Sequence, residues 1–195
     1  MNGPSLFRCP LCGSPLTREE RGCICPARHS FDRAAAGYVH LLPPNRMHSK
    51  APGDDREMVA ARAAFLECGY YAPLRHALEE LVLDASAHLE GPVLLDSGCG
   101  EGYYTAGMFR ALERAGHRPR AAGIDISKYA LRRAAKRLPE GEFAVASAYR
   151  LPLADASADL LTNVFSPLSA EEFARVLRPG GNFVYVVPSA GNLCY

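Results

Sequence analysis

The sequence predicts an α/β protein in which a small N-terminal zinc ribbon precedes a doubly wound, Rossmann-like parallel sheet. Two observations support this prediction. Four of the seven cysteines lie within the first 25 residues, and from residue 92 short apolar strands alternate with amphipathic helices. We therefore expect a zinc-binding module over 1–42, a linker with helices over 43–91 and the Rossmann-like domain over 92–195.

The composition fits a globular protein. The chain has 195 residues, of which 48% are hydrophobic and 22% are charged. No stretch approaches 18 consecutive apolar residues, and the N-terminus lacks the apolar core of a signal peptide. We therefore expect a cytoplasmic protein with no membrane partner.

Charge is unevenly distributed. Residues 1–50 hold seven basic and three acidic side chains, a net charge of +4, whereas the rest of the chain carries a net charge of −3. A basic head suggests contact with a polyanion, and a merely solvated surface is the alternative.

The spacing Cys9-x2-Cys12-x12-Cys25-x3-His29 fits a tetrahedral zinc site of the Cys3His type. Cys23 competes with Cys25, but we prefer Cys25 because residues 25–29 can fold as a second tight turn. Four protein ligands leave no position for a water molecule, so we expect a structural Zn²⁺ ion rather than a catalytic one.

The elements follow in order. In the ribbon we expect short strands around Leu16 and Ile24. Residues 31–43 are then expected to pack against the ribbon and to lead the chain out of it. Residues 43–56 are rich in Pro, Gly and charge and are expected to form a loop. Apolar periodicity predicts helices from near Glu57 to Gly69 and over 73–89.

The second half predicts five parallel strands joined by helices. We expect the helices over 103–115, 127–137, where Ser127 provides the cap, and 170–176. A turn at 178–181 precedes the fifth strand. The strands are expected over 93–96, 121–125, 143–147, 159–165 and 182–187.

A glycine-rich loop over 96–102 lies between the first strand and its helix. Its glycines do not match the dinucleotide pattern G-x-G-x-x-G, and Asp96 suits a cationic ligand better than a pyrophosphate. Asp125 ends the second strand, where it can accept both hydroxyls of a ribose. Together these features predict an S-adenosylmethionine (SAM) site of the class I methyltransferase type.

The residues around this loop have expected roles. Asp96 would face the methionine ammonium group through water, and Ser147 ends the third strand, where an adenine edge could be read. Cys99 is expected to be a packed residue rather than a nucleophile. The backbone of three glycines would pass under the methionine and ribose: Gly98, Gly100 and Gly102.

Catalytic residues are not evident from the sequence. Asn163 and Phe165 end the fourth strand, where class I methyltransferases hold the target, and strand-end packing is the alternative. Glu101 is a third candidate, although its place at a helix N-terminus also suits the helix dipole. We expect positioning of the substrate to carry most of the catalysis.

These residues resemble the bacterial large-subunit rRNA guanine-N1 methyltransferases of the RlmA type. The resemblance implies zinc on the four ligands above, SAM contacts from Tyr71 and the glycine-rich loop, and a guanine in a hairpin loop of 23S rRNA as the substrate. The matching runs are 9–12, 25 with 29–32, 37–39 with 41–42, 52–54, 57–58, 61–62, 65–66, 69–74, 96–105, 123–128 and 145–147.

The sequence departs from this family in two places. Asn192 stands where the family carries a cofactor-side histidine, and we take it as a cofactor-binding position. The chain stops at Tyr195, whereas the family continues through the last strands of a seven-stranded sheet. We therefore expect a C-terminally incomplete sheet in an apparently truncated chain, which puts turnover in doubt.

Two alternatives stay open at this point. One is a small-molecule SAM methyltransferase with a structural zinc, and the other is a truncated, non-catalytic zinc-containing RNA-binding relative. We expect the ribbon to bind RNA and the sheet to bind SAM, and we consider a homodimer as one state of assembly.

Overall fold

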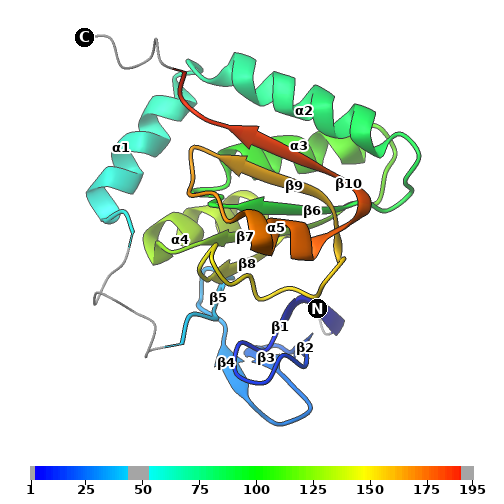
Figure 1. Cartoon of the computed structure of the whole chain (residues 1–195). Helices are drawn as coiled ribbons and strands as arrows, with labels where there is room; N and C mark the ends of the chain where they lie inside the picture. Colours follow the sequence, from blue (N-terminus) through cyan, green and yellow to red (C-terminus); the bar gives the residue numbers. More distant parts are fainter. Residues whose placement is uncertain (1–2, 44–52, 190–195) are drawn as a thin grey trace.

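The computed structural model describes residues 3–43 and 53–189, which form two sheets (Figure 1). The ribbon sheet has the order β1-β2-β3-β4, and all of its pairs are antiparallel. The main sheet has the order β10-β9-β6-β7-β8-β5, and all of its pairs are parallel. A zinc ribbon followed by a parallel α/β sheet is the predicted fold class.

The ribbon strands are short and close together. They are β1 (Gly3–Arg8), β2 (Pro15–Arg18), β3 (Gly22–Ile24) and β4 (Ser30–Asp32). A Cβ atom at Gly22 would collide with the backbone carbonyl of Phe31 on the neighbouring strand, so glycine is required there. Leu16 and Cys23 are buried, and they connect this sheet to the core of the larger domain.

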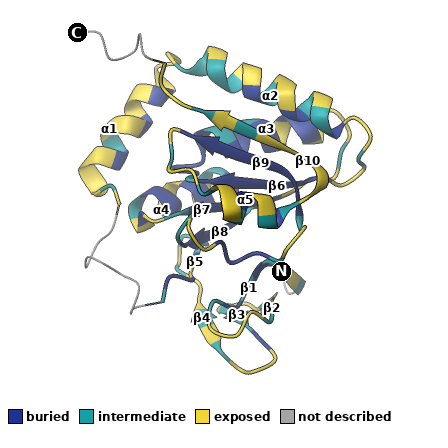
Figure 2. Ribbon diagram, in the orientation of Figure 1, coloured by how far each residue is buried: buried dark blue, intermediate teal, exposed yellow. Residues whose placement is uncertain are grey.

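The main sheet is centred on β6 (Val93–Ser97), with β7 (Arg120–Asp125) on one side and β9 (Ala158–Val164) on the other. Beyond them lie β8 (Glu142–Val145), next to β7, and β10 (Leu177–Val186), next to β9. Every residue of β6, β8 and β9 is buried (Figure 2), as expected for parallel strands covered on both faces. The turn expected at 178–181 lies within β10, where the register against β9 shifts between Leu177 and Asn182.

Five helices are present in the described residues: α1 (Arg56–Glu67), α2 (Ala72–Ser86), α3 (Tyr103–Arg114), α4 (Lys128–Arg137) and α5 (Ala170–Val176). The side chain of Asp55 caps α1 by accepting hydrogen bonds from two backbone N–H groups, and Ser127 caps α4 as predicted. The helix expected over 73–89 ends at Ser86, so its C-terminal boundary was predicted too late. No described helix is long and apolar enough to cross a membrane.

The two faces of the main sheet are covered differently. One face packs against α2, α3 and α4 through residues such as Leu78, Met108 and Leu131. The other face packs against Phe173 and Val176 of α5 and against ribbon residues that include Phe7 and Cys25. The ribbon therefore completes the second layer of the doubly wound fold.

The segment that leaves the ribbon joins the main sheet, which the sequence did not predict. The strand β5 (Val39–His40) pairs in parallel with β8 at its edge. Five strands were expected, and β5 is a sixth. The sequence does not reveal this strand, because the buried Val39 pairs beside Ala144 only once the ribbon has docked. Residues 44–52 of the expected loop lie outside the described residues.

A buried carboxylate fastens the ribbon to the sheet. Glu142 accepts hydrogen bonds from the Ser5 hydroxyl at 2.6 Å and from the Leu6 backbone N–H. Its oxygen Oε1 also lies 3.1 Å from the guanidinium of Arg120. Farther along β1, the Arg8 backbone N–H donates to the Pro152 carbonyl at 2.7 Å. Polar bonds and a shared core thus hold the ribbon against the larger domain.

Candidate functional site

Cys9, Cys12, Cys25 and His29 converge in the ribbon, with ligand atoms that all lie within 4.8 Å of one another. The Cys12 and Cys25 sulfur atoms are 3.7 Å apart, and Nδ1 of His29 lies 3.5 Å from Cys9 Sγ and 3.4 Å from Cys25 Sγ. Zinc at its usual bond lengths and tetrahedral angles places such donors about 3.5 to 3.8 Å apart. The cluster therefore fits a zinc ion.

Two matching turns build this cluster. In the first, the Gly13 N–H donates to the Cys9 carbonyl, and in the second the Arg28 N–H donates to the Cys25 carbonyl, both at 2.8 Å. Gly13 (φ 73°) and Arg28 (φ 65°) occupy the same left-handed region. Because this conformation is costly for a residue other than glycine, its use at Arg28 indicates that the turn is held by its surroundings.

Cys23 is not part of the metal cluster. It is buried in the core that joins the ribbon to the sheet, and that burial raises the pKa of its thiol to about 11. Its sulfur atom is not among the four donor atoms that converge in the ribbon. The structure thus agrees with the choice of Cys25.

The glycine-rich loop lies at the carboxyl end of β6 and is held against the neighbouring strand. The N–H groups of Gly98 and Cys99 both donate to the Ile124 carbonyl of β7, each at 2.9 Å. Cys99 is 7% exposed, and burial together with nearby carboxylates raises its pKa well above the usual value. This agrees with a packed residue rather than a nucleophile.

The three glycines of the loop serve different purposes, although all have positive φ angles. A Cβ atom at Gly98 would collide with Ser166, and one at Gly102 would lie 3.0 Å from Ala134 of α4. A Cβ atom at Gly100 would meet nothing within 4 Å. Gly98 and Gly102 are thus required by packing, whereas Gly100 keeps its backbone open to a ligand.

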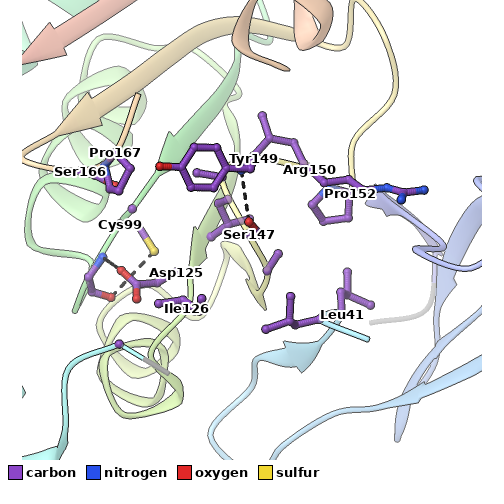
Figure 3. Close-up of a pocket in the computed structure, with 18 of the residues that line it drawn as sticks. Leu41, Cys99, Asp125, Ile126, Ser147, Tyr149, Arg150, Pro152, Ser166 and Pro167 are labelled. Atoms are coloured by element: carbon purple, nitrogen blue, oxygen red, sulfur yellow. Dashed lines mark hydrogen bonds between the residues drawn. The ribbon is translucent and has the colours of Figure 1, made fainter. Parts of the chain in front are cut away.

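Asp125 lies beside this loop (Figure 3). Its two carboxylate oxygens accept backbone hydrogen bonds from Gly100 at 3.0 Å and from Ser127 at 2.7 Å. Burial raises the pKa of Asp125, and these two hydrogen bonds act in the opposite direction. Asp125 lines the pocket, and each of its oxygens can accept a further hydrogen bond, so the carboxylate can bind a ligand that carries hydroxyl groups.

Asp96 and Glu101 occupy different surroundings. Asp96 is buried, accepts hydrogen bonds from the hydroxyls of Thr105 and Thr162, and is not among the residues that line the pocket. Glu101 is 2% exposed, lines the pocket and has one carboxylate oxygen without a partner in the described structure. Burial raises the pKa of both, to about 6 for Asp96. The available carboxylate on this side is Glu101.

A pocket of about 1550 Å³ connects the loop to the ribbon. Tyr71 and Phe165 meet edge to face on its wall, with ring centroids 5.9 Å apart. The Ser147 hydroxyl accepts a hydrogen bond from the Tyr149 N–H at 3.2 Å, and Figure 3 shows both residues between the side of Cys99 and Asp125 and the side of Leu41 and Pro152. The aromatic and polar groups therefore face one cavity.

Two further predicted residues lie elsewhere. The Asn163 side chain is fully buried, donates to the carbonyls of Ser97 and Pro167 and does not line the pocket, so it braces the end of β9. This favours the strand-end packing alternative. Asn192 lies outside the described residues.

Sequence reasoning missed much of the pocket wall. The segment 148–155, the ribbon residues Arg8–Pro10 and Arg62 of α1 all line the cavity. The segment is held by Arg175, whose guanidinium donates to the Leu151 and Leu153 carbonyls at 3.0 and 2.9 Å. No sequence motif marks these residues as pocket lining, and only the docking of the ribbon brings them together.

The comparisons with known proteins agree with this architecture. A zinc-ribbon family described as "RlmA, N-terminal" matches residues 7–50, and a methyltransferase domain family matches residues 95–185. A solved structure described as an S-adenosyl-L-methionine-dependent methyltransferase of Methanococcus maripaludis has a TM-score of 0.56 at 18% identity. It covers 71% of this chain and 66% of its own, which supports the fold alone.

Three curated relatives match almost the whole chain. A protein of Micromonospora griseorubida named as a 23S rRNA (guanine-N(1)-)-methyltransferase is 40% identical over 96% of this chain and 67% of its own length. The 23S rRNA (guanine(748)-N(1))-methyltransferase of Streptomyces fradiae is 39% identical over 96% and 65%, respectively. YxjB of Bacillus subtilis, named for the same reaction, is 35% identical over 97% and 66%. The chain thus spans about two thirds of the length of these relatives.

The fold and the pocket define a class I methyltransferase with SAM as its cofactor and a zinc ribbon as its N-terminal module. The zinc ribbon with its Cys/His cluster is what distinguishes it within that class. The chain belongs to the family of bacterial 23S rRNA guanine-N1 methyltransferases with an RlmA-type ribbon.

Proposed function

We propose that this protein transfers the methyl group of SAM to N1 of a guanine in 23S rRNA. The observation that carries the proposal is the pocket that joins the glycine-rich loop to the zinc ribbon in one chain of this family. SAM supplies an already activated methyl group, so the protein has to position the base and accommodate the loss of the N1 proton.

The residues at the loop would hold the cofactor. Asp125 would accept the ribose hydroxyls, because its two oxygens are already aimed by backbone N–H groups. Glu101, rather than Asp96, would take the methionine ammonium group, because Glu101 lines the pocket and Asp96 does not. Ser147 would meet the adenine edge, and the open backbone at Gly100 would lie under the cofactor.

The aromatic wall would hold the base. Bases of RNA loops can be splayed out and stacked on aromatic side chains, and Tyr71 and Phe165 present such a surface at the mouth of the pocket. Phe165 has a φ angle of 52°, a conformation that is costly for an aromatic residue and typical of functional sites. We propose that the base comes from a hairpin loop of the RNA and that Phe165 orients it.

Positive charge would assist the transfer. Loss of the N1 proton places negative charge on the guanine O6, and a pocket with fixed positive groups stabilises such charge. Arg150 lines the cavity, and so does Arg62, which forms an ion pair with Asp54. The zinc ion would stay structural, since the Cys3His set leaves no open position. An enzyme that acts on ribosomal RNA would work in the cytoplasm. The homodimer stays a prediction, and sedimentation would test it.

The test is methylation of an in vitro transcribed 23S rRNA with methyl-labelled SAM. We expect label in guanine and a primer-extension stop, because a methyl group on N1 blocks base pairing. Asp125→Ala should abolish the signal at low SAM concentration, and Arg118→Gln, an exposed change far from the pocket, should leave it intact. SAM binding without label in any RNA would reject the proposed reaction.

A further inference from the structure

The helix α4 differs in charge from every other described helix. It carries five basic and no acidic residues within ten positions, in the sequence KYALRRAAKR. The other four helices each contain acidic residues, and their net charges run from −2 for α2 to +1 for α3. The net charge of −3 over residues 51–195 hides this concentration.

Three of these residues form a line along the helix. Lys128, Arg132 and Lys136 are all exposed and follow one another at intervals of four, which places them about 6 Å apart along one side of α4. We call them the basic stripe. None of them forms an ion pair with another described residue. Arg137, by contrast, is bound to Glu67 at 2.6 Å and lies against the ring of Tyr103.

Helix stability alone does not account for the stripe. Basic residues near a helix C-terminus are favoured by the helix dipole, which explains Lys136. Lys128 occupies the first helical position, where the same dipole disfavours a positive charge, and Arg132 lies in the middle. Repulsion between like charges four residues apart adds a further cost. A negatively charged partner would offset these costs.

The stripe leads from the pocket to the ribbon. Its first residue follows Asp125 and Ile126, which line the pocket, and Ser127, which caps α4. Its last residue lines a shallow depression together with Arg21 and Arg33 of the ribbon and with two acids, Glu20 and Asp32. Figure 1 shows α4 between α1 and the ribbon end of the molecule.

We propose that the basic stripe binds consecutive phosphates of the RNA strand that brings the target base to the pocket, an inference that rests on the proposed function. The partner is a nucleic acid strand rather than a membrane surface, because the apolar side of α4 is buried. Ala130, Leu131, Ala134 and Ala135 all pack inside the protein and leave nothing to insert into lipid. The RNA contact thus extends beyond the ribbon onto the methyltransferase domain.

The test compares two double variants of the full chain. One is Arg132→Gln with Lys136→Gln, and the matched control is Arg114→Gln with Arg118→Gln. The control removes the same charge from exposed positions near the start of β7, at the end of the sheet opposite the pocket. Binding of in vitro transcribed 23S rRNA is measured as a function of salt, and SAM binding is measured in parallel to confirm that each variant is folded.

We expect the stripe variant to flatten the plot of log K against log salt by about 1.4 to 1.8, which corresponds to two lost phosphate contacts. Adding Lys128→Gln should lower the slope by a further 0.7 to 0.9 or so. At about 0.15 M salt the double variant should bind RNA roughly tenfold more weakly or worse. The control should match the wild-type protein, and SAM affinity should stay unchanged in all variants.

Equal slopes for the stripe variant and its control would overturn the inference, even if the wild-type protein methylates RNA. If the wild-type protein binds RNA through the basic stripe but does not methylate it, the proposed reaction is rejected and the proposed RNA-binding role of the stripe is retained. Absence of any RNA binding by a folded, SAM-binding wild-type protein would overturn both.

Discussion

The zinc cluster and the SAM pocket are built in opposite ways. The four metal ligands come from two tight turns within 21 residues, and each turn closes through its own backbone hydrogen bonds. The pocket takes its lining from Arg8 to Arg175 and exists only when the ribbon, α1, α5 and the main sheet are assembled. The spacing of residues close together in the sequence determines a metal site of this kind, whereas the pocket depends on the packing of elements that are distant in the sequence.

Removing a zinc ligand should have the largest effect, because a structural zinc site contributes on the order of 10 kcal/mol to folding. Cys25→Ala should lose the metal and unfold the ribbon, whereas Cys23→Ala should keep one zinc per chain. Elemental analysis and thermal unfolding measure the two outcomes. Retention of zinc in Cys25→Ala with its loss in Cys23→Ala would reverse the ligand assignment.

Loss of the ribbon should also affect the pocket, since Phe7, Cys9 and Cys25 share a core with Leu151 and Leu153 of the pocket-lining segment 148–155. We therefore expect chelation of zinc to weaken SAM binding in the same titration. SAM affinity that survives complete metal removal would show that the pocket does not need the ribbon.

Asp96 should make stability depend on pH. Its pKa of about 6 in the folded protein lies above the usual 3.8, because burial disfavours the charged carboxylate. The folded state then binds more protons at Asp96 between these values, so the contribution of Asp96 to the unfolding free energy is largest below pH 4 and falls by about 3 kcal/mol as pH rises through 6. Asp96→Asn should remove this dependence. Identical pH profiles of the unfolding free energy in both proteins would contradict the assignment.

Asp125→Ala should weaken SAM binding by on the order of 1.5 to 3 kcal/mol, which is about ten- to a hundredfold. Its carboxylate is oriented by two backbone N–H groups and is the group best placed for ribose hydroxyls. Calorimetric titration with SAM measures the loss. Glu90→Ala, which changes an exposed carboxylate paired with Arg118 and away from the pocket, is the control. Unchanged affinity in Asp125→Ala would show that the ribose is held elsewhere.

The smallest expected effect is a difference in stability between alanine variants of two glycines in the glycine-rich loop. Gly102→Ala should destabilise the fold by about 1 to 3 kcal/mol, because its left-handed backbone is combined with a 3.0 Å approach to Ala134. Gly100→Ala has the same backbone cost of about 1 kcal/mol but meets no neighbour, so its main effect should be on SAM affinity. Denaturant unfolding with and without SAM distinguishes the two. Equal behaviour of the two variants would remove the packing role of Gly102.

The sequence by itself predicted the Cys3His cluster that the structure brings together and the order of most elements. Cys9, Cys12, Cys25 and His29 follow from spacing, because tight turns bring neighbours in the chain together without help from the rest of the fold. The glycine-rich loop and Asp125 follow from the rule that parallel strands present their carboxyl ends at one edge of a sheet. These features depend on local geometry or on a general topological rule.

Only the tertiary structure decided which residues face the ligand. Asp96 and Glu101 are five positions apart, yet one is enclosed by two threonines and the other lines the pocket. The pairing of β5 with β8 and the docking of the ribbon over one face of the sheet set the remaining wall. The basic residues of α4 are visible in the sequence, but their line from pocket to ribbon is not, because long-range packing determines what a helix faces.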